Sequence, residues 1–128
     1  MKLLMDTHVA LWLFNDHENL SQTAKSYLLD EKNELHISIA SAWEIAIKHS
    51  LGKLTEFPSG VKLFLMELYS CPIAIVGIYP EHIEIVEELP FIHRDPFDRL
   101  IIATAIYEDM SILTGDENIH KYDVNCVW

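Results

Sequence analysis

The sequence predicts an α/β fold: a three-layer α/β/α sandwich in which helices cover both faces of a central parallel sheet. Short β-rich runs alternate with longer segments of helical periodicity, the order typical of parallel sheets. No internal repeat, low-complexity tract or Ser/Gly-rich linker divides the chain, and 128 residues is the usual size of one domain. We therefore expect a single domain spanning residues 1–128, with any site beyond the carboxyl ends of the strands.

The first half of the chain is expected to contain two strands and four helices. The strands are the apolar runs at residues 2–5 and 35–39. The helices begin at about Thr7 and then cover residues 21–32, 40–51 and 59–69. Ser21 is a good N-cap and Gly52 a natural C-terminal stop, which supports the second and third of these helices.

The second half is expected to contain three strands and two helices. The strands are residues 72–78, 111–114 and 124–128, and the helices are residues 81–89 and 95–109. Pro96 suits the first turn of the last helix. That helix is apolar on nearly every side, which predicts that it is buried.

Composition restricts the class of protein. Twenty Asp and Glu against nine Lys and Arg give a net charge of −11, which disfavours nucleic-acid binding through basic patches. Either a basic partner binds, or acids gather around cations. The apolar runs are too short for a membrane helix. Cys71 and Cys126 form no disulfide framework or metal motif. We therefore expect a reduced cytoplasmic protein without a membrane segment.

Two acids are expected at the carboxyl edge of the sheet. Asp6 closes the first strand, and Asp116 follows the strand at residues 111–114. Either residue alone is more simply explained as a cap or a turn residue. Because parallel strands end at one edge, the two together indicate a site.

Glu44 is the third candidate. At about 100° per residue it falls on the shoulder of an apolar stripe along its helix. That stripe consists of Ala40, Trp43, Ile47 and Leu51. A carboxylate there is partly desolvated, which is costly without a positive partner. The alternative is that Glu44 reaches solvent or pairs with Lys48.

Asp98 is the fourth candidate. It shares a helix face with Ile102 and Ala105, which predicts that its side chain points inward. The alternative role is structural, with Asp95 as the N-cap and Asp98 as an acid of the first turn. Asp98 can be both an acid of the site and an acid of the first helical turn.

Four converging carboxylates would repel one another unless divalent cations compensate. Oxygen ligands of this kind select Mg²⁺ or Mn²⁺. Such a site suits phosphodiester hydrolysis by an activated water, without a protein nucleophile. The cations would also supply the positive field that this acidic chain lacks.

Four motifs, in order along the chain, resemble those of PIN-domain ribonucleases, and most closely the VapC-type toxins of type II toxin–antitoxin pairs. They are LMDTH at 4–8, SAWEIAIK at 41–48, DPFDRLIIATA at 95–105 and LTGD at 113–116. The resemblance implies a PIN fold, Mg²⁺- or Mn²⁺-dependent endoribonuclease activity, neutralisation by a cognate antitoxin, and a homodimer. By motif, the catalytic and metal-binding acids are Asp6, Glu44, Asp98 and Asp116.

Three further residues are carried over as supporting ones. Thr114 matches a hydroxyl position that often supports the site. Arg99 matches the Asp-Arg-Leu variant of a toxin subgroup. Its side chain would contact the substrate or offset the negative charge of the acids. Glu117 is an alternative to Asp116 as the fourth acid.

Basic residues near these motifs are candidate RNA contacts. Lys48, with His49 and Lys53, forms a small basic cluster beyond Glu44, more usually a solvated face but here a reasonable phosphate contact. His8 and His93 are the histidines nearest the expected site, and His93 is the candidate contact. Trp12 and Trp43 are assigned to the core rather than to a dimer surface.

Two other classes of function compete with a nuclease. A non-catalytic PIN-like module could use the acids to bind a basic protein. A phosphoacceptor receiver domain is set aside, because the strand near residues 73–78 ends without an Asp. For the nuclease, we expect an antitoxin whose basic segment inserts an arginine among the carboxylates.

Overall fold

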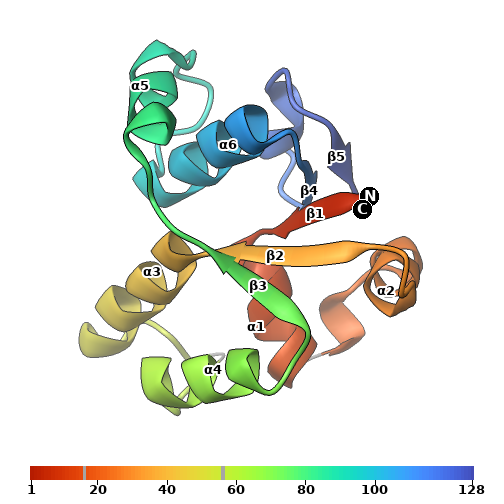
Figure 1. Cartoon of the computed structure of the whole chain (residues 1–128). Helices are drawn as coiled ribbons and strands as arrows, with labels where there is room; N and C mark the ends of the chain where they lie inside the picture. Colours follow the sequence, from red (N-terminus) through yellow and green to blue (C-terminus); the bar gives the residue numbers. More distant parts are fainter. Residues whose placement is uncertain (16, 56) are drawn as a thin grey trace.

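A five-stranded parallel sheet forms the centre of the molecule (Figure 1). This is a computed structural model, and it describes residues 1–15, 17–55 and 57–128. The strands are β1 (Lys2–Met5), β2 (Glu34–Ser38), β3 (Ile73–Val76), β4 (Ser111–Leu113) and β5 (Cys126–Val127). They lie in the order β3-β2-β1-β4-β5, and every neighbouring pair is parallel. The predicted α/β class with a central parallel sheet is confirmed.

Helices cover both faces of the sheet (Figure 1). The helices are α1 (Thr7–Asn15), α2 (Gln22–Leu29), α3 (Ile39–Ser50), α4 (Gly60–Tyr69), α5 (Pro80–Glu88) and α6 (Pro96–Glu108), with short 3₁₀ turns η1 (His17–Asn19) and η2 (Ile119–Lys121). The first four helices contribute to the core cluster on one face, and α5 and α6 contribute to the cluster on the other. No helix in the described part of the chain is both long and apolar enough to span a membrane.

Alternation along the strands supplies both clusters. Leu4 and Ile112 pack into the cluster with α6, whereas Met5 and Leu113 pack into the opposite one. All four side chains are fully buried. Since successive residues of a strand point to opposite faces, a strand covered on both sides must be apolar throughout. This explains why the run that predicted β1 has three apolar residues in succession, Leu3, Leu4 and Met5.

The predicted elements all occur, with shifted ends. The second helix ends at Leu29 rather than near residue 32, and β3 ends at Val76 rather than at residue 78. Gly52 follows α3 with a φ of 68°, as its predicted role as a helix stop requires. The turns η1 and η2 were not predicted, because three residues carry too little periodicity.

The assignment of the two tryptophans to the core is half correct. Trp12 is partly buried against the core and lies 5.9 Å, ring to ring, from Trp128. Trp43, by contrast, is 58% exposed, so its predicted place in the core is wrong. Its indole packs edge-on against the ring of Phe97 in α6, on the solvent-exposed side of α3.

Candidate functional site

The ends of β1 and β4 form the centre of the candidate site. These two strands are adjacent and parallel, with Met5 paired to Leu113. Asp6 follows β1 directly, and its backbone N–H donates to the Leu113 carbonyl at 3.1 Å. Thr114 and Asp116 follow β4. The topology therefore brings the first and last predicted acids to the same edge of the sheet.

Asp6 is buried, with 4% of its surface exposed. Its Oδ2 accepts a hydrogen bond of 2.8 Å from the Thr114 hydroxyl, whereas its Oδ1 has no hydrogen-bond partner among the described residues. Burial raises the pKa of Asp6, and the charge of Glu44 adds to that rise. The Thr114 hydrogen bond and His8 act in the opposite direction. A buried carboxylate with one orphaned oxygen is costly unless a cation approaches it.

Glu44 lies on α3 and is 2% exposed. Its Oε2 accepts a hydrogen bond from the Lys48 ammonium, while its Oε1 has no partner among the described residues. Thr7 fixes this helix beside Asp6, because its hydroxyl donates to Ser41 of α3 at 2.8 Å. The site therefore contains a second buried carboxylate oxygen that no donor satisfies.

The burial of Glu44 was predicted, but from the wrong helix face. Trp43 and Leu51, assigned to the apolar stripe, are 58% and 60% exposed. The buried face of α3 instead carries small side chains around Glu44 and Ile45. The helix is therefore rotated relative to the predicted stripe, so that Ala42 and Ile45 pack inward and Trp43 and Leu51 lie outside.

Asp98 lies in the first turn of α6. Asp95 caps that helix and accepts hydrogen bonds from the backbone N–H groups of Phe97 and Asp98, so the predicted capping role of Asp95 is confirmed. The Asp98 side chain is 14% exposed. Burial and, after it, the charges of Asp6, Asp95, Glu44 and Asp116 together raise its pKa to about 8. Asp98 therefore interacts electrostatically with all three of the other predicted acids.

His93 connects the remaining acids. Its Nε2 lies 2.9 Å from Oδ2 of Asp98 and 3.1 Å from Oδ2 of Asp116. These three are the one group of metal-ligating side chains in the described residues whose ligand atoms lie within 4.8 Å of one another. Asp6 and Glu44 do not belong to that group. Sequence reasoning named His93 as a candidate contact to RNA or metal without specifying its partners, since a lone histidine in a loop carries no spacing signal.

The supporting residues divide into two kinds. Thr114 lies where expected, bonded to Asp6 and accepting from the backbone N–H of Asp116 at 3.0 Å. Asp116 rather than Glu117 contacts His93, and Glu117 is exposed. Arg99 is different, because its side chain faces away from the acids.

Arg99 is buried and hydrogen-bonded within the fold, an arrangement that supports neither a contact with substrate nor one with the acids. It is 5% exposed. Its guanidinium donates to the carbonyls of Val86, Leu89 and Pro90, and to the hydroxyl of Tyr122. The five fixed donors of a guanidinium suit such a set of carbonyls. Arg99 thus secures the end of α5 and the loop that follows it.

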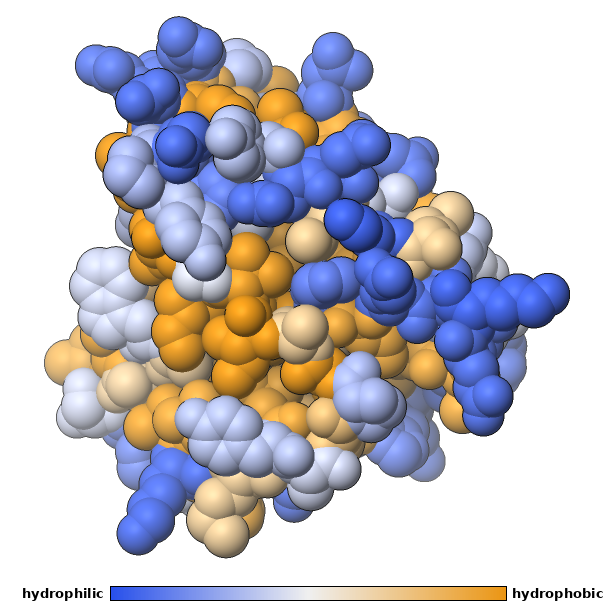
Figure 2. All heavy atoms as spheres, viewed as in Figure 1, coloured by the Kyte–Doolittle hydropathy of each residue, from blue (hydrophilic) through white to orange (hydrophobic). Residues whose placement is uncertain are grey.

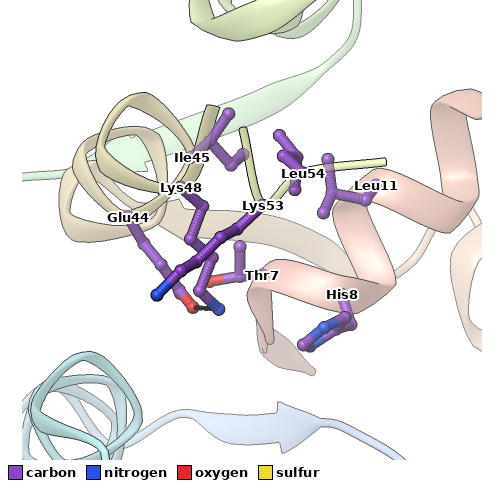
Figure 3. A pocket seen from close by; sticks show the side chains of 8 residues that line it. All are labelled: Thr7, His8, Leu11, Glu44, Ile45, Lys48, Lys53 and Leu54. Atoms are coloured by element: carbon purple, nitrogen blue, oxygen red, sulfur yellow. Dashed lines mark hydrogen bonds and ion pairs between the residues drawn. The ribbon is translucent and has the colours of Figure 1, made fainter. Parts of the chain in front are cut away.

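A cavity of about 150 Å³ opens beside Glu44 (Figure 3). It is lined by Thr7, His8, Leu11, Glu44, Ile45, Lys48, Lys53 and Leu54. The long side chains of Lys48 and Lys53 both extend toward the Glu44 carboxylate (Figure 3). Burial lowers the pKa of Lys48, but the hydrogen bond and charge of Glu44 outweigh burial and raise it overall. This cavity therefore presents positive charge next to the acids, within a chain that is otherwise acidic.

A PIN-domain family model matches residues 3–125, so the chain belongs to the PIN-domain family. Within known proteins, it is 30% identical over 121 residues to Ribonuclease VapC22 of Mycobacterium tuberculosis, covering 94% of this chain and 91% of that protein. The predicted resemblance to VapC-type PIN domains is thereby confirmed.

Solved structures with this fold include VapBC complexes. The crystal structure of VapBC2 from Rickettsia felis, bound to a promoter DNA fragment, matches with a TM-score of 0.73 and 17% identity, over 99% of this chain and 98% of that one. The structure of VapBC-1 from nontypeable Haemophilus influenzae matches with a TM-score of 0.67 and 13% identity, over 99% and 97%. At these identities the likeness concerns the fold.

Proposed function

We propose that this protein is a divalent-metal-dependent endoribonuclease and the toxin of a type II toxin–antitoxin pair, its whole length forming one PIN domain. Asp6, Glu44, Asp98 and Asp116 form its active site and bind Mg²⁺ or Mn²⁺. The observation that carries the proposal is the pair of buried, unpartnered carboxylate oxygens, Oδ1 of Asp6 and Oε1 of Glu44. The name of the relative in Mycobacterium tuberculosis, a ribonuclease, agrees with it.

The donor set fits a hard divalent cation. Carboxylate oxygens are the ligands that Mg²⁺ and Mn²⁺ prefer, and a cation is the kind of partner that the buried oxygens Oδ1 of Asp6 and Oε1 of Glu44 lack. It would also offset the burial and the mutual repulsion that together raise the pKa of Asp98 to about 8. Once bound, a divalent ion supplies Lewis acidity toward phosphodiester oxygens and lowers the pKa of water.

Other side chains of the protein orient the acids and contact the substrate. Thr114 holds Asp6 through Oδ2, which fixes the direction of Oδ1. Lys48 does the same for Glu44. Lys53, which lines the cavity beside Glu44, is placed to contact a phosphate of the RNA next to the scissile one. Substrate would therefore approach along the side of the site where α3 and the following loop lie.

We further propose that an antitoxin blocks this site with a basic segment. The acids and a net charge of −11 favour a positively charged partner. An arginine would donate to two carboxylates together and occupy the position of the cation. The VapBC complexes among the structures of like fold agree with such a partner. A complex in which the acids remain open and metal-loaded would contradict this mode of inhibition.

A second copy of the chain is the proposed occupant of an exposed apolar face, as expected for a homodimer. Figure 2 shows hydrophobic surface gathered near the middle of the face on which β3 lies in front in Figure 1. Trp43 of α3 and Met66 of α4 are each 58% exposed, and Ile75 of the edge strand β3 is 36% exposed. Size-exclusion chromatography with light scattering tests this: a monomer at micromolar concentration would contradict it.

Cleavage of RNA by matched variants tests the proposed activity. Asp6→Asn and Asp98→Asn replace a carboxylate by a nearly isosteric amide, so both should fold while losing the cleavage activity. Glu31→Gln, a change at an exposed acid far from the edge, is the control and should cleave like the wild type. Wild-type cleavage by Asp6→Asn, or by wild-type protein in excess EDTA, would contradict the proposal. A non-catalytic binding module would cleave no RNA in any variant.

A further inference from the structure

The cavity beside Glu44 has an apolar part and an accessible ring. In Figure 3 the side chains of Leu11, Ile45 and Leu54 lie on one side of it, and the imidazole of His8 lies on another. The three apolar side chains are at most 9% exposed, whereas His8 is exposed. Apolar side chains together with an accessible ring are the surroundings in which proteins bind flat aromatic groups.

The ring of His8 is packed against a second ring. His8 lies in the first turn of α1, and its ring is 5.8 Å, centroid to centroid, from that of Trp12 one turn further along the helix. Trp12 in turn contacts the indole of Trp128. His8 is therefore the end of a row of three rings, and among these three it is the one that lines the cavity.

Lys48 and Lys53 supply positive charge to the same cavity. The Lys48 ammonium is hydrogen-bonded to Glu44. Lys53 is exposed, and it forms no ion pair with a carboxylate of the described residues. In a chain with a net charge of −11, an ammonium without a carboxylate partner favours an anionic ligand at this place. A basic segment of a protein partner would be repelled by the two lysines.

The size of the cavity corresponds to one six-membered ring. Its volume is about 150 Å³. An apolar cavity of roughly that volume inside a protein admits one benzene molecule. A pyrimidine base has a single ring of this size, whereas a purine base carries a second, fused ring. The cavity therefore fits a pyrimidine more closely than a purine.

We propose that this cavity binds the base of a pyrimidine nucleotide adjacent to the scissile phosphate, with His8 stacked on the base and Lys53 at the neighbouring phosphate. The inference rests on the proposed function, since it takes RNA as the substrate. The RNA must be single-stranded here, because only an unpaired base can leave its neighbours and enter a cavity. Glu44 lines the cavity and also belongs to the proposed active site, so a base bound here lies beside the acids.

Cleavage of a short single-stranded RNA of randomised sequence, followed by sequencing of the product ends, tests the preference. The wild type should select a pyrimidine at one position flanking the cleaved bond. His8→Ala removes the ring and should lose that selection. His8→Phe keeps a ring without its nitrogens and should retain it. His17→Ala, at an exposed histidine of η1, is the control and should select as the wild type does.

An abasic nucleotide at the selected position separates stacking from other effects of His8. For the wild type, loss of the base should lower kcat/KM by about 10–100-fold, the usual effect of removing one stacked base. His8→Ala should show a similar loss with intact RNA and no further loss with abasic RNA, because the interaction is already absent. Equal losses by His8→Ala on both RNAs would show that His8 acts on the acids instead, since it also lowers the pKa of Asp6.

The remaining outcomes distinguish the cavity from the activity on which it depends. Cleavage without a preference for pyrimidines, or with a preference that His8→Ala leaves intact, would overturn the role of the cavity and leave the nuclease activity in place. Absence of RNA cleavage by the wild type would overturn the proposed function, and the inference with it.

Discussion

Thr114 and Asp6 stand 108 residues apart in the sequence and are joined by a buried hydrogen bond of 2.8 Å. The Thr114 hydroxyl donates to Oδ2 of Asp6 and accepts from the backbone N–H of Asp116 at 3.0 Å. One side chain thus connects the ends of β1 and β4. It donates a hydrogen bond to one oxygen of Asp6, and the other oxygen has no hydrogen-bond partner among the described residues.

We expect Thr114→Val to weaken Mn²⁺ binding by about 10–100-fold, the usual effect of removing a hydrogen bond that orients a metal ligand. The substitution keeps the shape of the side chain but removes the donor. Thr114→Ser restores the hydroxyl and should recover most of the affinity. Calorimetric titration measures both. Equal affinities for the valine variant and the wild type would show that Thr114 does not orient Asp6.

Without metal, the protein should become less stable as pH rises. The pKa of Asp98 is about 8 in the folded protein against an ordinary value of 3.8. Between these values the folded state holds a proton that the unfolded state releases, so stability falls as pH increases through this range and levels off above about 8. Burial raises the pKa of Asp6 as well, which acts in the same direction.

Melting temperatures in EDTA from pH 5 to pH 9 measure this effect. Asp98→Asn cannot ionise at this position, so its melting temperature should depend less on pH, and at pH 9 it should exceed that of the wild type. Added Mn²⁺ should reverse the loss for the wild type but not for the variant. Identical pH profiles for the two proteins would contradict the burial of an ionisable Asp98.

The two arginines of the chain should differ sharply in their effect on stability. Arg99→Met removes a buried guanidinium that satisfies three carbonyls and a hydroxyl, and we expect a loss of about 2–4 kcal/mol. Arg94 is exposed, and Arg94→Met should change stability by less than about 0.5 kcal/mol. Urea denaturation measures both. Similar small effects would mean that Arg99 does not secure the loop.

A stabilising substitution is expected at the end of α6. Asp109 has a φ of 55° and a ψ of 51°, a left-handed conformation that glycine adopts without steric cost. Its negative charge also lies at the unfavourable end of the helix dipole. Asp109→Gly should raise the free energy of unfolding by about 0.5–1 kcal/mol.

Asp30 is the matched control for that substitution. It also follows a helix, α2, but with a φ of −77°, where glycine gains nothing. Asp30→Gly should therefore be destabilising in the same urea titration, since it also removes the acceptor of the Lys32 backbone N–H. A gain at both positions would show that charge at the helix end, rather than backbone conformation, limits stability.

Sequence patterns predicted the elements that depend on local signals. Short β-rich runs between helical segments marked the five strands, and β1, which is covered on both faces, is apolar from Leu3 to Met5. Asp95 and Pro96 marked the start of α6 through capping chemistry that involves only neighbouring residues. The same reasoning put Asp6 and Asp116 at one edge, since parallel strands end together.

Features that depend on distant packing could not be predicted. Trp43 looked like a core residue, yet the face of α3 that packs inward carries Ala40, Ala42 and Ile45, and Trp43 lies on the exposed side. Arg99 follows an acid of the site, but the carbonyls that it satisfies belong to α5 and the next loop. The contacts of His93 likewise depend on a loop conformation fixed by Tyr122, which lies far along the chain.

Anomalous diffraction from crystals grown with Mn²⁺ tests the central claim most directly: that acids from residues 6, 44, 98 and 116 form one metal site. The account predicts an anomalous peak within bonding distance of Oδ1 of Asp6 and Oε1 of Glu44, the two oxygens that lack partners. The peak should disappear in Asp6→Asn crystals grown in the same way. Crystals grown at saturating Mn²⁺ that show no peak beside those oxygens, or that show Mn²⁺ only elsewhere, would contradict the claim.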